Sequence, residues 1–312
     1  MSKYKTPKVE DLFEAGVHIG HQARRWHPKM EPYIFSSENK VHVFDLEQTQ
    51  DLLKKASDVL YELAKKGEQI IFVGSKRQAS KPVKEAAKRC GAMYVTERWL
   101  GGTITNYKMI KRNMDKLVGN MKKREEGGFQ KYTKKERLLI DREIEKLEKY
   151  VGGLISLRGA PSILVIIDPR KEKTAVREAV RSNLPVIALI DSNSDPSKIT
   201  YPIPGNDDAI KSISLIINSL ADAVEEGYKE FAKIGEKLKK DAEDALKVVE
   251  PTPAEIKPLT IKIAAKGETL EKELIKPEES LPVVVEEIVA EEQKTDAVKD
   301  KKLAKVTKTK KS

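Results

Sequence analysis

Short apolar runs alternate with helical patterns through the middle of the chain, from about residue 70 to residue 221. Runs rich in Val, Ile and Leu occupy residues 69–76, 162–169 and 184–191. Continuous apolar runs of this kind are typical of parallel strands that are covered on both faces. Amphipathic helical patterns follow them at residues 77–90, 171–183 and 207–228. This order predicts β-α-β units, which build a parallel sheet.

The series begins further upstream, with an apolar run at residues 41–45 and a helical pattern at residues 46–66. We expect residues 41–45 to form the first strand of the same sheet. The predicted fold class is therefore α/β, with a doubly wound and mostly parallel sheet of the flavodoxin-like type.

Residues 103–154 interrupt this alternation. Apolar residues recur at intervals of three and four from Tyr107 to Met121, and again from Ile140 to Leu154. A Gly-Gly turn at residues 127–128 separates the two stripes. They predict an inserted antiparallel coiled-coil hairpin that begins with Thr103 as its N-cap, with arms of about 20 residues and roughly 30 Å. The alternative is a helical pair that lies flat on the sheet.

The hairpin divides the α/β domain into a first part, residues 1–102, and a second part, residues 155–233. The remaining residues, 234–312, begin with a helical pattern that ends at the prolines after residue 250. Pro, Glu, Lys and Val then dominate, with almost no aromatic residues, which predicts a disordered extension.

Charge narrows the class of partner. The chain has 59 Lys and Arg against 49 Asp and Glu, a net charge of +10. The two signs nearly balance from Lys229 onward, so the excess belongs to the preceding residues and favours a polyanionic partner. Cys90 is the single cysteine, which excludes an internal disulfide, and no apolar run has spanning length. We expect a cytosolic protein without a membrane partner.

The fold itself raises one alternative, a nucleotide- or sugar-phosphate-binding enzyme, because doubly wound sheets bind ligands beyond the carboxyl ends of their strands. The turn at residues 73–81 has one glycine, Gly74, where a dinucleotide fingerprint has three, and it does not match the P-loop pattern. No grouping of Ser, His, Asp or Cys indicates a nucleophile site. We therefore expect no catalytic residue and no cofactor.

Aspartates follow the predicted strands and could hold a hard cation such as Mg²⁺. The metal candidates are Asp191, Asp207 and Asp208, and turn or cap chemistry is the favoured role for them and for Asp168 and Asp195. His18 and His21 have a spacing that allows a shared metal, but no other metal-binding pattern accompanies them. The sequence leaves open whether an incidental Mg²⁺ or Zn²⁺ binds there.

Two segments have the composition of an RNA-binding surface. Residues 16–35 interleave cations with aromatic residues in a loop that suits phosphate contact and base stacking, although Trp26 could instead anchor the loop while its arginines are solvated. Residues 97–113 place cations around the expected start of the hairpin, where free N–H groups bind phosphate. A third group of cations follows Gly74 and consists of Lys76, Arg77, Lys81 and Lys84. The first three are expected to be free to meet phosphates. The candidate RNA-binding residues are Arg24, Arg25, Trp26, Lys29, Lys76, Arg77, Arg98, Lys108, Lys111 and Arg112.

The joint order of these motifs resembles the ribosomal protein S2 family of bacteria and organelles. The motifs are AGVHIGHQARRWHPKMEPYIF, VGSKRQA, ERWLGGTITN, PSILVIIDPRKEKTAVREA, DSNSDP and PGNDDAI, and they cover about residues 9–231. The resemblance implies a doubly wound domain with a coiled-coil hairpin. It also implies a structural constituent of the small ribosomal subunit that binds ribosomal RNA near the head–body junction and supports translation.

The same resemblance implies partners and a location. The partners are other small-subunit ribosomal proteins, including the large messenger-binding protein made of repeated OB domains, and the location is the ribosome in the cytoplasm. We expect no obligate homo-oligomer. The long hairpin favours the bacterial type, since archaeal and eukaryotic relatives typically lack it.

Overall fold

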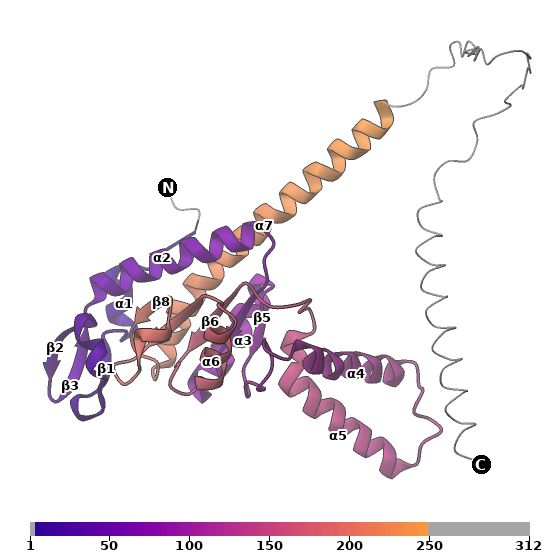
Figure 1. Ribbon diagram of the computed structural model, residues 1–312, viewed down its shortest axis with the longest axis horizontal. Helices are drawn as coiled ribbons and strands as arrows, with labels where there is room; N and C mark the ends of the chain where they lie inside the picture. Colours follow the sequence, from indigo (N-terminus) through magenta and orange to yellow (C-terminus); the bar gives the residue numbers. More distant parts are fainter. Residues whose placement is uncertain (1–3, 249–312) are drawn as a thin grey trace, which may run out of the picture. The chain divides into compact units, whose positions relative to one another are not determined.

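The computed structural model describes the backbone of residues 4–248 and the side chains of residues 4–235 (Figure 1). Its strands are β1 (Ile19–Gln22), β2 (Ile34–Glu38), β3 (Val41–Phe44), β4 (Ile70–Val73), β5 (Met93–Val95), β6 (Ile163–Ile167), β7 (Val186–Ile190) and β8 (Tyr201–Pro204). Its α-helices are α1 (Val9–Glu14), α2 (Leu46–Lys65), α3 (Arg77–Cys90), α4 (Tyr107–Glu125), α5 (Lys134–Val151), α6 (Lys173–Arg181) and α7 (Ile210–Val248). Short 3-10 turns are η1 (Ala23–Arg25), η2 (Pro28–Tyr33), η3 (Gly152–Leu154) and η4 (Pro196–Lys198). Within this described part, no helix is long and apolar enough to cross a membrane.

The main sheet has five strands in the order β5-β4-β6-β7-β8, and every neighbouring pair is parallel. The chain starts near the middle at β4, steps outward to β5, and then returns to the other side of β4. This is the flavodoxin-like order, so the predicted fold class is confirmed. The strands predicted from apolar runs at residues 69–76, 162–169 and 184–191 are β4, β6 and β7.

Two apolar layers cover the sheet, because successive side chains of a strand point to opposite faces. On one face, residues such as Phe72 and Val165 pack with buried side chains of α2, α3 and α7. On the other face, residues such as Val73 and Ile166 pack with α6 and with the bases of α4 and α5. All residues of β4, β6 and β7 are buried, which is why these strands were recognisable in the sequence.

The prediction that residues 41–45 begin the parallel sheet is wrong. Strand β3 pairs antiparallel with β1 and β2 in a separate three-stranded sheet of order β1-β3-β2. Buried residues alternate with half-buried ones along β3, as expected where only one face packs on a core. Asn39 and Lys40 both have positive φ, which matches the tight turn of a β2–β3 hairpin.

Strand β8 is not among the strands that the sequence pattern predicts. It contains Pro202 and Pro204, which weaken any strand signal because proline lacks the N–H that a ladder needs. The strand is tolerated because it lies at the edge of the sheet and pairs with β7 alone.

The insertion contains two helices, α4 and α5, that lie side by side beyond the β5 end of the sheet (Figure 1). The buried residues of the insertion's two helices are Ile110, Met114, Leu117, Ile144 and Val151, which belong to the predicted stripes. Coiled-coil geometry for the pair stays a prediction. The expected N-cap at Thr103 is wrong, because α4 begins at Tyr107 and Thr103 is buried in the preceding turn with its hydroxyl donated to the carbonyl of Leu100.

Helix α7 continues as one helix through Val248, so the predicted boundary between residues 233 and 234 falls inside it. The predicted disordered extension lies outside the described residues after 248.

Packing between α2 and α7 depends on Gly227. A Cβ atom there would lie 2.5 Å from the Cβ of Ala64 and 2.7 Å from the carbonyl oxygen of Tyr61. Gly227→Ala is therefore expected to lower the free energy of unfolding by about 1–3 kcal/mol in urea titrations, the usual range for overpacking. Gly235→Ala in the same helix is the control, because its Cβ would meet nothing within 4 Å and helix propensity alone predicts a small gain. Equal effects of the two changes would contradict the packing argument.

Candidate nucleic-acid interface

The basic loop at residues 23–33 is fastened to the carboxyl end of the main sheet. The backbone N–H of His27 donates to the carbonyl of Ser192, just after β7, at 2.7 Å. The Trp26 ring lies 5.3 Å from the ring of His42 at 42°, and Trp26 keeps 37% of its surface exposed. The loop is therefore anchored while its indole remains accessible for stacking.

A cavity of about 520 Å³ lies between this loop, the start of α6 and the loop that follows β7. The cationic residues that line it are Arg25, Arg170, Lys173, Arg177 and Lys198. All five are exposed, and no ion pair engages any of them among the described side chains. The acidic residue in the lining is Asp195, whose pKa is lowered by the N–H of Ser197. The cavity is therefore an electropositive site with an aromatic wall.

Of the RNA-binding residues expected in the loop, Arg25 and Trp26 line the cavity, whereas Arg24 and Lys29 do not. The Nε of Arg24 donates to Gln22, and the ammonium of Lys29 lies 2.6 Å from the Ser197 hydroxyl and 3.6 Å from Asp195.

Sequence reasoning missed four cations of the cavity: Arg170, Lys173, Arg177 and Lys198. A signal was present, because Lys173 and Arg177 are four residues apart and therefore share one face of α6. Their convergence on the loop of Trp26 depends on the fold.

A second group of predicted cations surrounds the start of α4. Arg98, Lys108, Lys111 and Arg112 are all exposed there. The N–H groups around the expected helix start at Thr103 are engaged, because the buried carboxylate of Glu178 on α6 accepts from Gly102 at 2.7 Å and Ile104 at 3.0 Å. The exposed side-chain cations of this region stay candidates for phosphate contact.

Glu178 organises the whole turn before α4. Besides the two backbone groups, it accepts from the Trp99 indole at 3.2 Å and from the N–H of Thr105 at 3.3 Å. Burial opposes its ionisation, yet these donors hold the pKa of the carboxyl below its ordinary value. The turn is therefore built around one ionised side chain.

The turn after β4 does not have the properties of a phosphate loop. A Cβ on Gly74 would lie 2.9 Å from the Val83 side chain, so this glycine permits close packing of α3 on the strand. The N–H and hydroxyl of Ser75 both donate to the carboxylate of Glu172. An anionic side chain therefore stands where the enzyme hypothesis needs a phosphate.

The expectation that Lys76 is free to meet phosphates is wrong. Its ammonium lies 2.7 Å from Asp207 and 2.6 Å from Asp208, and only 14% of the side chain is exposed. Arg77, the next residue, is exposed and stays a candidate.

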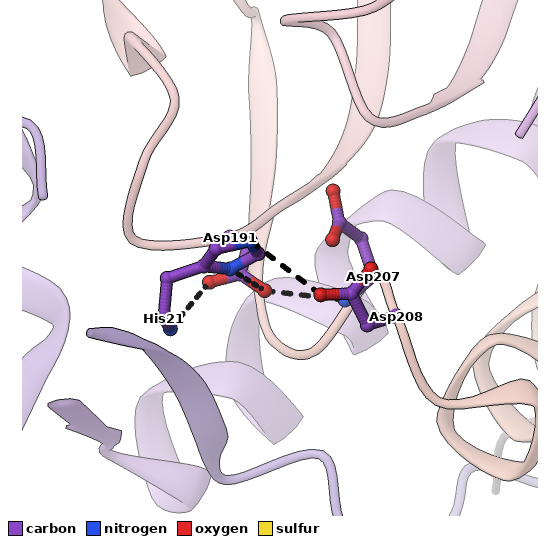
Figure 2. Close-up of side chains that lie close together, drawn as sticks. All are labelled: His21, Asp191, Asp207 and Asp208. Carbon is purple, nitrogen blue, oxygen red and sulfur yellow. Dashed lines mark hydrogen bonds and ion pairs between the residues drawn. The ribbon is translucent and has the colours of Figure 1, made fainter. Parts of the chain in front are cut away.

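The three metal candidates lie together with one of the two expected histidines (Figure 2). Asp191 follows β7, Asp207 and Asp208 follow β8, and His21 comes from β1. His18 stacks on Phe13 at 4.4 Å and is not in this group, so the His18–His21 metal pair that the spacing allows does not form. Burial, together with the nearby charges of Asp191 and Asp168, raises the pKa of Asp207 to about 7. A hydrogen bond to Asp191 raises the pKa of His21.

The favoured cap and turn role is confirmed for two other aspartates. Asp168 accepts from the N–H groups of Arg170 and Lys171, and Asp195 accepts from that of Ser197.

Comparisons with known proteins agree with the motif order. A profile of the family described as "Ribosomal protein S2" matches residues 12–227. Among curated proteins, "Small ribosomal subunit protein uS2c" of Cyanophora paradoxa is 48% identical over 219 residues, which covers 70% of this chain and 94% of that protein. "Small ribosomal subunit protein uS2" of Dictyoglomus thermophilum is also 48% identical over 219 residues, covering 70% of this chain and 89% of that protein.

Proposed function

The chain belongs to the ribosomal protein S2 family, and we propose that it is a structural constituent of the small ribosomal subunit that binds ribosomal RNA. The observation that supports RNA binding is the cavity beside Trp26, where five exposed cations converge and have no ionic partner among the described side chains. RNA phosphates would provide the missing counter-charge and would release condensed counterions on binding.

The aromatic wall of the cavity supports single-stranded or looped RNA as the ligand. A base stacks on an exposed indole without regard to its identity, and the cations around Trp26 meet the adjoining phosphates. The exposed cations at the start of α4 are a second candidate contact for RNA. The protein acts by positioning RNA, and its role in translation is structural rather than catalytic.

Neighbouring small-subunit proteins are further partners in this proposal, among them the large messenger-binding protein of repeated OB domains. The inserted helices favour such contacts because several of their apolar side chains are exposed. Met109, Leu138 and Leu139 are each 51–55% exposed. Exposed apolar groups on a projecting element are typical of protein-binding surfaces.

Sedimentation of a cell lysate through a sucrose gradient tests the proposal directly. The protein is expected to migrate with small ribosomal subunits and to stay with them through a wash in moderate salt. Weak electrostatic adsorption would be lost in that wash, because each phosphate contact weakens as salt rises. Recovery of the protein only at the top of the gradient would contradict the ribosomal role.

A further inference from the structure

We propose that His21, Asp191, Asp207 and Asp208 form a binding site for one divalent transition-metal ion, with Zn²⁺ as the best match. One ligand atom from each of the four residues lies within 4.8 Å of all the others (Figure 2). This site is separate from the cationic cavity and does not depend on the proposed binding of RNA.

The histidine is the first argument for a transition metal. Its Nδ1 lies 2.9 Å from an oxygen of Asp191, and its Nε2 lies 3.4 Å from an oxygen of Asp208. Donors held about 2.0–2.1 Å from a tetrahedral zinc ion are roughly 3.3 Å apart. The ion would bind one of the two ring nitrogens, and each of them has a carboxylate oxygen near that separation. Mg²⁺ and Ca²⁺ prefer oxygen alone, whereas an imidazole with carboxylates suits zinc.

Asp207 gives an independent indication of a missing ligand. The residue is fully buried, and its Oδ1 oxygen accepts from Lys76, but its Oδ2 oxygen has no hydrogen-bond partner among the residues that the structure describes. An unsatisfied carboxylate oxygen in a buried position is costly, and native proteins rarely leave one without a donor or a cation. A metal ion at the cluster would satisfy it.

The charge balance of the region points the same way. Asp168 adds a further carboxylate beside Asp207 and Asp208. Among the described residues, Lys76 is the only Lys or Arg that forms ion pairs with these three aspartates. A dication bound beside Lys76 and a neutral His21 would supply three positive charges to these carboxylates, whereas Lys76 and a protonated His21 supply two.

The surrounding backbone holds the ligands in place. The Oδ1 oxygen of Asp191 accepts from the N–H groups of His21 at 3.1 Å and of Ser192 at 2.6 Å, which leaves Oδ2 facing the imidazole. Hydrogen bonds of this kind orient metal ligands and raise their affinity. Because η1 with Arg25 begins two residues after His21, a bound ion would also fix the start of the basic loop.

Metal binding is tested on the full-length protein without a histidine tag, after dialysis against a chelator. Calorimetric titration with ZnCl₂ is expected to give one equivalent, together with a rise in Tm that MgCl₂ does not produce. Asp208→Asn and His21→Gln are each expected to weaken zinc binding at least tenfold, in line with the loss of a metal ligand or its orienting group. Asp195→Asn is the matched control, because that exposed aspartate lies outside the cluster and is expected to leave zinc affinity unchanged.

Asp208→Asn is the variant that is expected to disturb the fold less, because 55% of the Asp208 side chain is exposed and asparagine has the same shape. Circular dichroism of each variant verifies the fold. The site is overturned if no equivalent of zinc binds, or if both variants bind zinc as the wild type does. Equal affinity for Mg²⁺ overturns the transition-metal assignment. None of these results bears on sedimentation with ribosomal subunits, which tests the RNA role separately.

Discussion

Replacing Arg25, Arg170 and Arg177 together with glutamate is expected to weaken binding to small-subunit ribosomal RNA by about a hundredfold or more at roughly 0.15 M salt. The three guanidinium groups line one cavity and have no ionic partner among the described side chains. Their reversal therefore removes phosphate contacts and adds repulsion without breaking an ion pair of the fold. Filter binding or calorimetry with a fragment of the RNA measures the loss, and incorporation into subunits is expected to fall with it.

The salt dependence of RNA affinity distinguishes phosphate contacts at the cavity from attraction by the net charge of the protein. Loss of three contacts is expected to reduce the slope of log affinity against log salt by about two to three, since each contact contributes about 0.7–0.9. The control triple, Lys54→Glu, Lys55→Glu and Lys88→Glu, changes the net charge equally on exposed positions of α2 and α3. An equal loss of affinity in the control would show that net charge, rather than the cavity, governs binding.

The parts of the fold that were predictable are those where one local pattern determines the outcome. Strands β4, β6 and β7 are buried on both faces, so each had to be a continuous apolar run. The prediction for α3 matches its observed bounds, residues 77–90, because its apolar face is regular and glycine follows its last residue.

Elements at the margin of the sheet were misread for a physical reason. The β3 sequence contains enough apolar residues to look like a core strand, but its neighbours in space are β1 and β2. Nothing local distinguishes a half-buried antiparallel strand from a short parallel one. The prolines of β8 concealed a strand that only its edge position allows.

The sequence predicted individual residues of the candidate site but not which of them lie together in space. Trp26 and Arg25 stood out because cations and aromatic residues interleave in one loop. Arg177 became part of the same surface only when α6 packed beside that loop. His21 was paired in the sequence with His18, yet its partner is Asp191, 170 residues away. Contacts between residues so far apart in the sequence depend on the chain topology, and the spacing of neighbouring residues does not predict them.

Glu178→Ala is expected to lower the free energy of unfolding by about 3–5 kcal/mol, because several buried donors lose their acceptor. The substitution leaves the N–H groups of Gly102 and Ile104 and the indole N–H of Trp99 without their acceptor inside the protein. Each buried donor without an acceptor costs about 1–3 kcal/mol. Urea titration gives the magnitude, and hydrogen exchange at Gly102 and Ile104 shows whether the loss begins in this turn. Glu85→Ala on the exposed face of α3 is the control, with an expected change below about 0.5 kcal/mol.

The pH dependence of stability in a second variant, Glu178→Gln, identifies the ionised carboxylate as the cause. Because its donors lower the pKa of Glu178 in the folded state, its ionised form stabilises the protein above its ordinary pKa of 4.5. That contribution is lost as the pH falls through the lowered folded-state pKa. The gap in stability between the wild type and Glu178→Gln is therefore expected to narrow below pH 4.5. A gap that stays constant through this range would mean that the carboxyl acts by shape alone, and that the turn before α4 does not depend on its charge.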